Sequence, residues 1–429
     1  MIWLAALALL LLALMGAPLF AVLLAAAALG YYSLGLDLAV LHIDLYQISD
    51  SVVLMALPLF TFAGFLLSEA KTADRLLRLS RAAFGWMPGG MAFVALMACA
   101  FFTALTGGSG VTIVALGGLL LPALVKAGYP QRFSTGLMTT SGSLGLLLIP
   151  SVPLLIYGIL AQQLSRELDM PPVDIVDLYL AGIMPAMLMI GLLYLYSLWA
   201  TRHDPVPRQS FDATELRAAL YDARWELPLP FVILGGIFSG ILVISEAAAI
   251  TALYVLIVEV FLYREISLRR LPGVMRESMV MVGGILLILG VAMSFAGYLV
   301  YAGVPEQLFA FLQEHVDRRW VFLILLNLVL LALGALLDIF AALVIMVPLI
   351  LPVAVAFGID PVHLGIIFVA NMQIGYFTPP VGMNLFIASY RFRKPITELY
   401  AATLPFMLVL LVALVLITWV PWLSLALVR

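Results

Sequence analysis

The stretch from Asn371 to Gly382 reads Asn-Met-Gln-Ile-Gly-Tyr-Phe-Thr-Pro-Pro-Val-Gly and lies within a long apolar region. Its paired prolines, Pro379 and Pro380, remove backbone donors and clash with the preceding turn, so the segment cannot stay a regular helix. A helix that breaks in hydrocarbon leaves carbonyl and amide groups unpaired, unless protein surrounds the break. The stretch therefore predicts a protein-lined cavity within a membrane domain.

The whole chain has the composition of a multi-span membrane protein. Of its 429 residues, 65% are hydrophobic and 10% are charged, and the mean hydropathy is +1.17. A soluble domain carries about 25% charged residues, so this chain could not cover a water-facing surface. The net charge of −3 gives no reason to expect a nucleic-acid partner, and the single cysteine, Cys99, excludes an internal disulfide. We expect no enzymatic activity, no cofactor and no transition-metal site.

Several apolar stretches have the length of a simple transmembrane helix, about 20 residues. They are 1–29, 52–68, 178–200, 229–244, 246–263, 279–300 and 397–425. Two longer blocks, 91–125 and 321–357, can enter the membrane and return on the same side. Each precedes a stretch with a Gly/Pro break, 132–163 or 363–390. We predict an all-α polytopic fold with two re-entrant helical hairpins and two discontinuous helices.

The distribution of basic residues supports the hairpins. With a cytoplasmic N-terminus and hairpins that leave on the side they entered, all but four of the 21 Lys and Arg residues face the cytoplasm, as the positive-inside rule expects. The exceptions are Arg166, Arg318, Arg319 and Arg429. A full crossing by either block would invert every later segment and remove this agreement. The C-terminus is therefore predicted to be periplasmic.

The predicted organisation places two moving units among scaffold spans. In chain order we expect N-terminal scaffold spans (1–68), an amphipathic arm (69–90), the first hairpin with its broken helix (91–163), a scaffold span (164–200), a cytoplasmic linker (201–228), scaffold spans (229–263), a second arm (264–278), a span with an outer loop (279–320), the second hairpin with its broken helix (321–390) and a C-terminal span (391–429). The alternative for the two arms is ordinary loops with basic anchors.

The two hairpin units align at one offset of 230 residues. The matched pairs are Pro122 with Pro352, Ser141 with Asn371, Gly145 with Gly375, and Pro150 with Pro380. Because the predicted sides are opposite, the units form an inverted repeat, which secondary transporters use to place a substrate site near the midplane. The alternative is that the small residues merely permit kinks and tight helix packing.

The breaks supply the candidate site residues. Carbonyl and hydroxyl oxygens suit a hard cation such as Na⁺, whereas exposed helix N-termini favour an anionic substrate. Predicted Na⁺ ligands are Thr106, Gly107, Gly108, Ser109, Gly145, Asp338, Gly375, Thr378 and Gly382. Predicted substrate-binding residues are Ser109, Ser141, Ser143, Asn371 and Thr378, and the predicted helix breaks are Pro150, Pro153, Pro379 and Pro380.

Asp338 is the most informative single residue. It stands in an apolar run, where an acid costs about 2.5–3.5 kcal/mol even on permissive insertion scales, and it falls at the predicted tip of the second hairpin. We interpret it as a cation ligand; the alternative is an acid that caps a hairpin helix. Glu246, at the start of a span, is interpreted as a helix N-terminal acid.

Motifs spread over nearly the whole chain resemble one transporter family. The segments are Gly358–His363, Asn371–Gly375, Thr378–Phe386, Ser245–Ala249, Tyr263–Glu265, Phe295–Gly297, Leu336–Asp338 and, in the first half, Gly145 with Ile149–Gly158. They are similar to the large membrane subunit, of the DctM type, of TRAP (tripartite ATP-independent periplasmic) transporters. The chain departs from the family pattern at Pro150-Ser151, where the family commonly has two prolines.

This resemblance implies a function and partners. It implies an elevator-type secondary transporter of the ion-transporter superfamily, in which the hairpins and broken helices slide against a scaffold, driven by Na⁺. The implied partners are a small four-helix membrane subunit (DctQ type), a soluble periplasmic substrate-binding protein (DctP type) and membrane lipid. The implied substrate is a carboxylate or similar organic anion, and the implied location is the bacterial or archaeal inner membrane.

Two other functions stay open at this point. A stand-alone Na⁺/anion symporter would share the fold but need no binding protein. An intramembrane serine protease is suggested by Gly107-Gly108-Ser109-Gly110, which resembles the Gly-x-Ser-Gly of rhomboid proteases. A protease would also need a histidine near Ser109, and the predicted topology puts all four histidines at span ends or in loops: His42, His203, His315 and His363.

Overall fold

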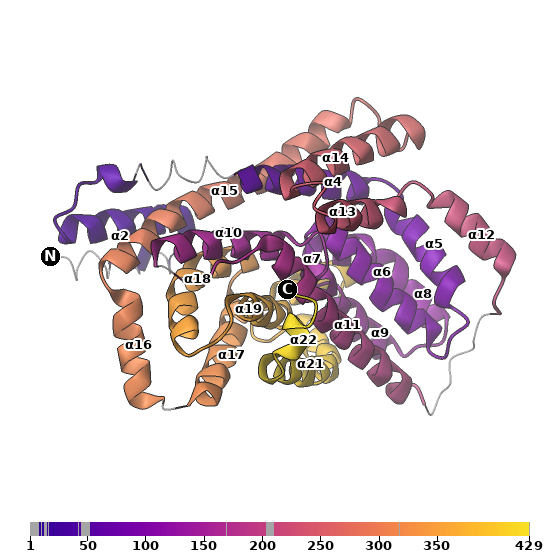
Figure 1. The fold of residues 1–429 in the computed structure, drawn as a ribbon. Coiled ribbons are helices and arrows are strands. Elements are labelled where there is room, and N and C mark those ends of the chain that lie inside the picture. The colour runs from indigo at the N-terminus through magenta and orange to yellow at the C-terminus, as the bar shows by residue number, and fades with distance from the viewer. Residues whose placement is uncertain are drawn as a thin grey trace.

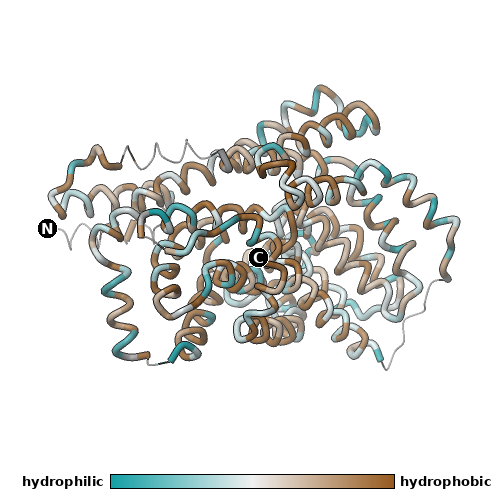
Figure 2. The backbone as a smooth tube through the Cα atoms, in the orientation of Figure 1, coloured by the Kyte–Doolittle hydropathy of each residue, from teal (hydrophilic) through white to brown (hydrophobic). Residues whose placement is uncertain are grey.

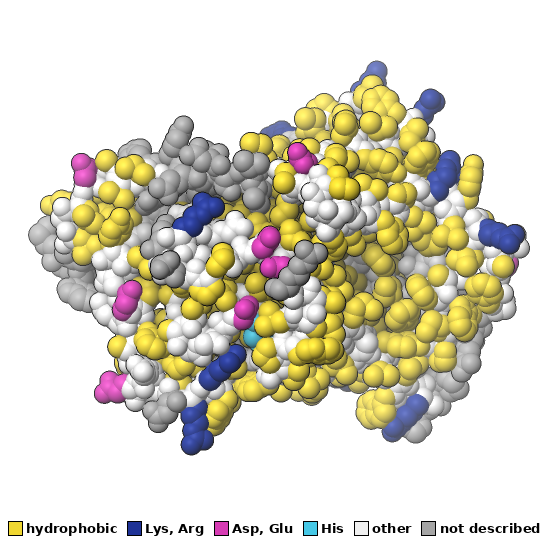
Figure 3. Space-filling model, viewed as in Figure 1, with side chains coloured by type: hydrophobic (Ala, Val, Ile, Leu, Met, Phe, Trp, Pro, Cys, Tyr) yellow, Lys and Arg dark blue, Asp and Glu magenta, His cyan; other side chains and the backbone are white. Residues whose placement is uncertain are grey.

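The computed structural model describes residues 8–9, 11–12, 15, 17–41, 43, 52–168, 170–202, 210–316 and 318–428. Within these ranges every regular element is helical, which confirms the predicted all-α fold (Figure 1). Six of the described helices are long and apolar enough to cross a membrane alone. Figure 2 shows hydrophobic residues along most helices, and Figure 3 shows a face with many hydrophobic side chains and scattered charged ones. Parts of the predicted first span, 1–29, and of the linker, 201–228, lie outside the described residues.

One group of helices comes from the segments assigned to the scaffold. It comprises α2 (Leu19–Ser33), the 3-10 helix η1 (Val52–Met55), α4 (Ala56–Glu69), α13 (Pro228–Phe238), α14 (Ile244–Leu256), the π-helix η3 (Ile257–Leu262) and α15 (Leu271–Tyr301). Helix α15 packs against both α2 and α4, and it is continuous from Leu271, where the sequence predicted an arm that ends at residue 278. The reason is that Pro272 occupies the first turn of α15, where a helix accepts proline.

The first hairpin unit consists of two interrupted stretches. Its elements are α6 (Gly90–Thr106), α7 (Ser109–Ala115), α8 (Gly117–Lys126), α9 (Gln131–Ser141), the 3-10 helix η2 (Leu144–Leu147) and α10 (Val152–Glu167). The chain bends by 52° between α7 and α8, and by 41° between the α9–η2 stretch and α10. Pro150 lies in the second break, whereas Pro153 lies in the first turn of α10 and so belongs to the helix start.

The second hairpin unit repeats this order with longer hairpin helices. Its elements are α17 (Arg319–Leu336), α18 (Ile339–Ala356), α19 (Pro361–Gly375) and α20 (Met383–Phe392). Residues 376–382, with Pro379 and Pro380, therefore lie between two helices. Helix α16 (Val304–His315) precedes the unit and packs on α18.

Each break packs closely, through a glycine, against the first helix of its own hairpin. A Cβ added at Gly145 would fall on α6, 2.5 Å from the Ala104 nitrogen. A Cβ added at Gly375 would fall on α17, 2.5 Å from the Gly334 Cα. Both residues of the second contact stand 230 positions after those of the first, so the offset seen in the sequence recurs as an equivalent packing contact.

The two units also pack against each other through the second helix of each hairpin. Helix α7 packs on α20, where a Cβ at Gly110 would lie 2.6 Å from Ile387 Cδ1. In the corresponding place α18 packs on α10. Each hairpin therefore packs against the second half-helix of the other unit, and the four breaks belong to one packed body.

Helix α11 (Ile175–Ala200) joins this body together with α21 (Ile396–Trp419) and α22 (Trp422–Leu425). Gln373 Nε2 on α19 donates to Met189 Sδ at 3.1 Å, and Gly182 is packed so closely that an added Cβ would fall on the Leu147 carbonyl. Apolar periodicity shows which face of α11 is buried but not which partner covers it, and the assignment of residues 164–200 to the scaffold stays a prediction.

The charged contacts gather at the amphipathic helix α5 (Thr72–Phe84), which lies in the segment predicted as the first arm. Arg75 lies 2.5 Å from Glu226, 3.4 Å from Glu259 and 2.6 Å from Glu265. Its guanidinium also stacks 3.9 Å from the centre of the Tyr263 ring. These contacts hold α5 to the two ends of the α13–α14 region.

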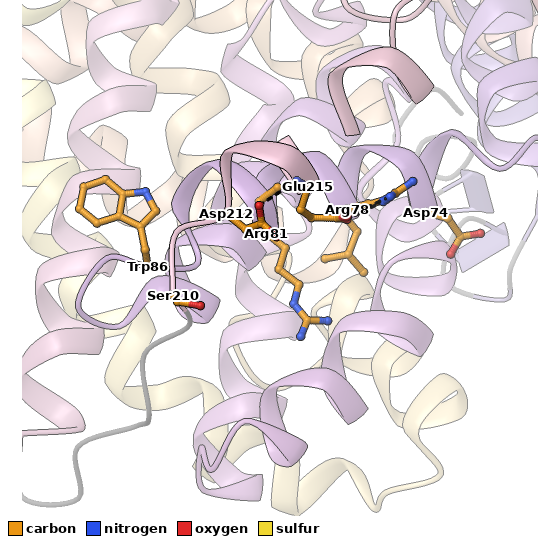
Figure 4. A pocket seen from close by; sticks show the side chains of 9 residues that line it. Asp74, Arg78, Arg81, Trp86, Ser210, Asp212 and Glu215 are labelled. Carbon is orange, nitrogen blue, oxygen red and sulfur yellow. Dashed lines mark hydrogen bonds and ion pairs between the residues drawn. The ribbon is translucent and has the colours of Figure 1, made fainter. Parts of the chain in front are cut away.

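A surface pocket of about 420 Å³ lies between α5 and α12 (Ala213–Asp222). Figure 4 shows Arg78 directed toward Glu215 across this pocket, with Trp86 at its far end. Arg78 pairs with both Glu215 and Asp222 of α12, and these ion pairs join α12 to α5.

We expect Gly375→Ala to lower stability by about 1–3 kcal/mol, because its methyl group would overlap backbone that cannot move aside. Thermal unfolding of the purified protein in detergent measures the change. Gly191→Ala is the matched control, since no atom lies within 4 Å of that added Cβ, and its unfolding temperature should stay equal or rise. Equal loss in both variants would contradict the tight contact.

Arg75→Gln should cost about 3–5 kcal/mol, because it leaves buried carboxylates unpaired. Arg270→Gln breaks only an exposed pair with Glu69, whose side chains are 50% and 38% exposed, and should cost at most about 1 kcal/mol.

The cost should also depend on pH. Burial raises the pKa of the Glu226 carboxyl despite the attraction of Arg75. A carboxyl whose pKa rises on folding stabilises most below its unfolded pKa and loses that contribution as pH rises. Without Arg75 this loss grows, so the variant should be more impaired at pH 8 than at pH 5. Chemical denaturation at pH 5 and pH 8 measures the free energy of unfolding of the wild type and the variant. An equal loss of stability at both pH values would contradict a role of Arg75 in holding the carboxyl cluster.

Candidate functional site

The two broken helices meet at equivalent positions. Ser143 Oγ, in the first break, donates to the backbone oxygen of Gln373 at 3.1 Å, and the two residues are 230 positions apart. Residues related by a two-fold rotation meet each other only at the rotation axis. The contact therefore marks where a local two-fold axis between the units would pass, at the centre of the packed body.

A cluster of oxygens surrounds the first hairpin tip. Thr103 Oγ1 lies 2.7 Å from Thr112 Oγ1, 2.7 Å from the Cys99 oxygen and 2.9 Å from the Gly142 oxygen. Both threonine side chains are fully buried. Two hydroxyl protons serve several acceptors here, because Thr112 Oγ1 also lies 3.2 Å from the Gly108 oxygen. The cluster is therefore rich in electron pairs and poor in donors.

The first hairpin tip closes on the second break. Ser109 Oγ donates to Asn384 Oδ1 at 2.9 Å, across 275 residues of chain. Asn384 lies in the first turn of α20 and is fully buried, and its backbone N–H donates to the Tyr376 oxygen at 2.9 Å. Residues from both units thus form a single polar contact between a hairpin tip and a half-helix N-terminus.

Asp338 has the geometry of a helix cap. Its Oδ1 accepts from the Phe340 and Ala341 backbone N–H groups at 2.9 and 3.1 Å, and the residue is exposed. This is the alternative that the sequence left open, and it is compatible with a ligand role, because both bonds use one oxygen of the carboxylate. The adjacent Ile339 N–H donates to the Tyr376 hydroxyl at 2.9 Å, which fixes the tip to the second break.

The structure does not bring the other predicted residues into one cluster. Thr106, Thr378 and Ser141 direct their hydroxyls to carbonyl oxygens of their own helices, those of Phe102, Ile374 and Met138. Asn371 turns toward α17, where its Nδ2 donates to Asn327 Oδ1 at 2.6 Å. The glycines serve as close-packing or turn positions: Gly107 has φ 69° and Gly382 has φ 50°.

The protease alternative needs a histidine beside Ser109. Ser109 is hydrogen-bonded to Asn384 instead. His363 lies against Ser424 and the Thr418 oxygen. His42 and His203 lie outside the described residues.

Sequence reasoning missed Thr103, Thr112 and Asn384. Thr112 follows Ser109 by three positions and so shares its helix face, which is a usable signal. Asn384 stood in the segment that carried the family resemblance, but nothing in its local sequence indicated a partner 275 residues away.

Comparisons with known proteins agree on one family. Residues 6–423 match the model described as "Tripartite ATP-independent periplasmic transporter, DctM component". The chain is 38% identical to the C4-dicarboxylate TRAP transporter large permease protein DctM of Rhodobacter capsulatus, over 87% of this chain and 86% of that protein. It is 33% identical to the isethionate TRAP transporter permease protein DctMQ of Oleidesulfovibrio alaskensis, over 87% of this chain and 57% of the relative.

A solved structure shows a similar fold. The YdaH transporter of Alcanivorax borkumensis, described as having an unusual topology, superposes with a TM-score of 0.63 at 20% identity, over 90% of this chain and 88% of that chain. At this identity the likeness concerns the fold alone.

We expect cysteines at 109 and 384 to form a disulfide on mild oxidation, because the side chains they replace are in contact. A protease site inserted at Ser210 separates the two halves on a denaturing gel, so the cross-linked pair should stay joined after cleavage. Ser109→Cys alone and Asn384→Cys alone are the controls. Halves that always separate would show that this tip does not rest on α20.

Proposed function

Because the chain belongs to the DctM family of tripartite ATP-independent periplasmic transporters, we propose that it imports a small organic anion by Na⁺ symport. The family assignment confirms the resemblance found in the sequence. The protein is thus a multi-pass membrane transporter subunit. The coupling ion, the delivery of substrate and the moving parts belong to the proposal.

The oxygen cluster at the first tip is the observation that carries the Na⁺ proposal. Thr103 Oγ1 lies 2.7 Å from Thr112 Oγ1 and 2.9 Å from the Gly142 oxygen. A hard monovalent cation gains from such oxygens, and broken helices in transporters supply backbone carbonyls for this purpose. We place the first Na⁺ here, beside the predicted ligands Gly107, Gly108 and Ser109.

A second Na⁺ site follows from the repeat. The second tip carries Asp338, whose carboxylate keeps one oxygen that the cap does not use. The neighbouring carbonyls of residues 375–382 lie in the equivalent break. A carboxylate that both caps α18 and binds Na⁺ would couple the ion to the closure of that hairpin.

The proposed substrate is a carboxylate or similar organic anion. The relative from R. capsulatus is named for C4-dicarboxylates, and the half-helix α20 presents an N-terminus within the packed body, which favours negative charge. A periplasmic binding protein would deliver the anion.

The proposed motion is an elevator movement of the interlocked units. Their hairpins, broken helices, α11 and α21 pack as one body, and α4 meets the first tip at Gly64, where an added Cβ would lie 2.7 Å from Thr106 Cα. We propose that a small membrane subunit supports the scaffold; the relative named DctMQ is longer than the matched region, which spans 57% of it. We further propose a cytoplasmic N-terminus and a periplasmic C-terminus.

Uptake of radiolabelled succinate into proteoliposomes tests this function. With the small subunit and a cognate binding protein present, an inward Na⁺ gradient should drive accumulation. Uptake that is indifferent to the gradient would contradict Na⁺ coupling. Uptake at full rate from free succinate, without the binding protein, would favour a stand-alone symporter.

Asp338→Asn separates the two roles of this residue, because asparagine is also a good N-cap but carries no charge. We expect Asp338→Asn to unfold at the wild-type temperature and to lose Na⁺-driven uptake. Asp338→Ala should lose both uptake and about 1 kcal/mol of stability. If the asparagine variant transports normally, Asp338 is only a cap.

A further inference from the structure

The buried amide of Asn384 is incompletely satisfied. Its Oδ1 accepts from Ser109 Oγ at 2.9 Å, but its Nδ2 has no hydrogen-bond partner among the described residues. The residue is fully buried. Burying an amide donor without a partner costs stability, so a residue of this shape without the amide would suit the fold better. An amide kept in such a place indicates a partner that arrives from outside.

The position of Asn384 defines the charge of that partner. It is the second residue of α20, a ten-residue helix whose N-terminus lies at the second break. The backbone N–H groups of Asn384 and Leu385 already donate to the Tyr376 and Gly382 oxygens. The helix dipole and the two unpaired hydrogens of Nδ2 therefore favour an acceptor with negative charge. A cation at Asn384 would bind Oδ1 and would leave the hydrogens of Nδ2 without a partner.

We propose that Asn384 Nδ2 binds a carboxylate group of the transported anion, with Ser109 closing over it from the first hairpin tip. This inference rests on the proposed function and adds a substrate-binding residue to it. The Ser109–Asn384 contact joins the two units, so a carboxylate bound there would link occupancy of the site to the position of the first hairpin. Ser109 can turn its hydroxyl from Asn384 Oδ1 to the arriving carboxylate, because a hydroxyl donates one proton in any rotamer.

The proposal distinguishes Asn384 from the other incompletely satisfied amides. Asn371 and Gln373 retain unpaired oxygens, while their nitrogens are bonded to Asn327 and Met189. The donors of those two side chains are therefore satisfied on α17 and α11. Among the buried side chains that the structure describes, the unpaired donors are the Tyr179 hydroxyl, in the second turn of α11, and Asn384 Nδ2, in the first turn of α20.

Asn384→Asp is the decisive variant, because it keeps the shape and replaces the donor with an acceptor. In proteoliposomes its KM for succinate should rise at least about tenfold, the value of one charge-assisted hydrogen bond. The Na⁺ concentration for half-maximal uptake should stay unchanged. Asn384→Ser, which keeps a hydroxyl donor, should raise the KM less than the aspartate does.

Gln162→Glu is the matched control for the chemical change. Gln162 Nε2 donates to the Val173 oxygen at 3.0 Å, at the far end of α10, so the same substitution there should leave the KM for succinate unchanged. A wild-type KM in Asn384→Asp would overturn the proposal, as would a tenfold rise in Gln162→Glu.

Direct binding keeps the test independent of transport. Succinate should raise the unfolding temperature of the wild-type protein in detergent, and should raise that of Asn384→Asp less or not at all. An equal shift in both proteins, or none in the wild type, would overturn the assignment. Failure of the proposed function has a different signature: uptake or binding would lose its Na⁺ dependence, while the difference between Asn384→Asp and wild type would persist.

Discussion

In hydrocarbon, each backbone donor and acceptor needs a partner, and the rest of this structure depends on how the breaks meet that requirement. Each break is enclosed by protein: Gly145 against α6, Gly375 against α17, and Ser143 against the Gln373 oxygen between them. The missing glycine side chains are what allow this close approach. Unwound backbone can then exist inside the protein, where its polar groups face other protein groups instead of lipid and are available to the proposed Na⁺ and substrate anion.

The polar groups are divided between two tasks. Inside the packed body the chain uses hydroxyls, amides and carbonyls, which bind without the large desolvation cost of a permanent charge. The strong charges lie at α5, where Arg75 gathers Glu226, Glu259 and Glu265 and fixes the arm next to the first hairpin. Charged contacts thus fix the arm and uncharged contacts surround the first tip, while the second tip adds the carboxylate of Asp338.

Sequence reasoning captured the features that rest on local chemistry. Two consecutive prolines interrupt a helix, so the break at Pro379 and Pro380 could be located from the sequence. The repeat offset of 230 reappeared in the contact of Gly334 with Gly375. Sequence reasoning could not find partners set by tertiary packing. The Ser109–Asn384 bond, the oxygens around Thr103 and the packing of α11 on the broken helices join segments whose own sequences carry no sign of each other. Asp338 shows the intermediate case, since its cap follows from local sequence and its proposed ion does not.

The central claim is that backbone and hydroxyl oxygens at the paired breaks hold Na⁺. An electron cryo-microscopy map of the purified protein in NaCl, compared with one in choline chloride, tests it most directly. The account predicts a density between Thr103 Oγ1, Thr112 Oγ1 and the Gly142 oxygen that is present only with Na⁺. Two identical maps, both with Thr103 and Thr112 bonded directly to each other and no density between them, would contradict it.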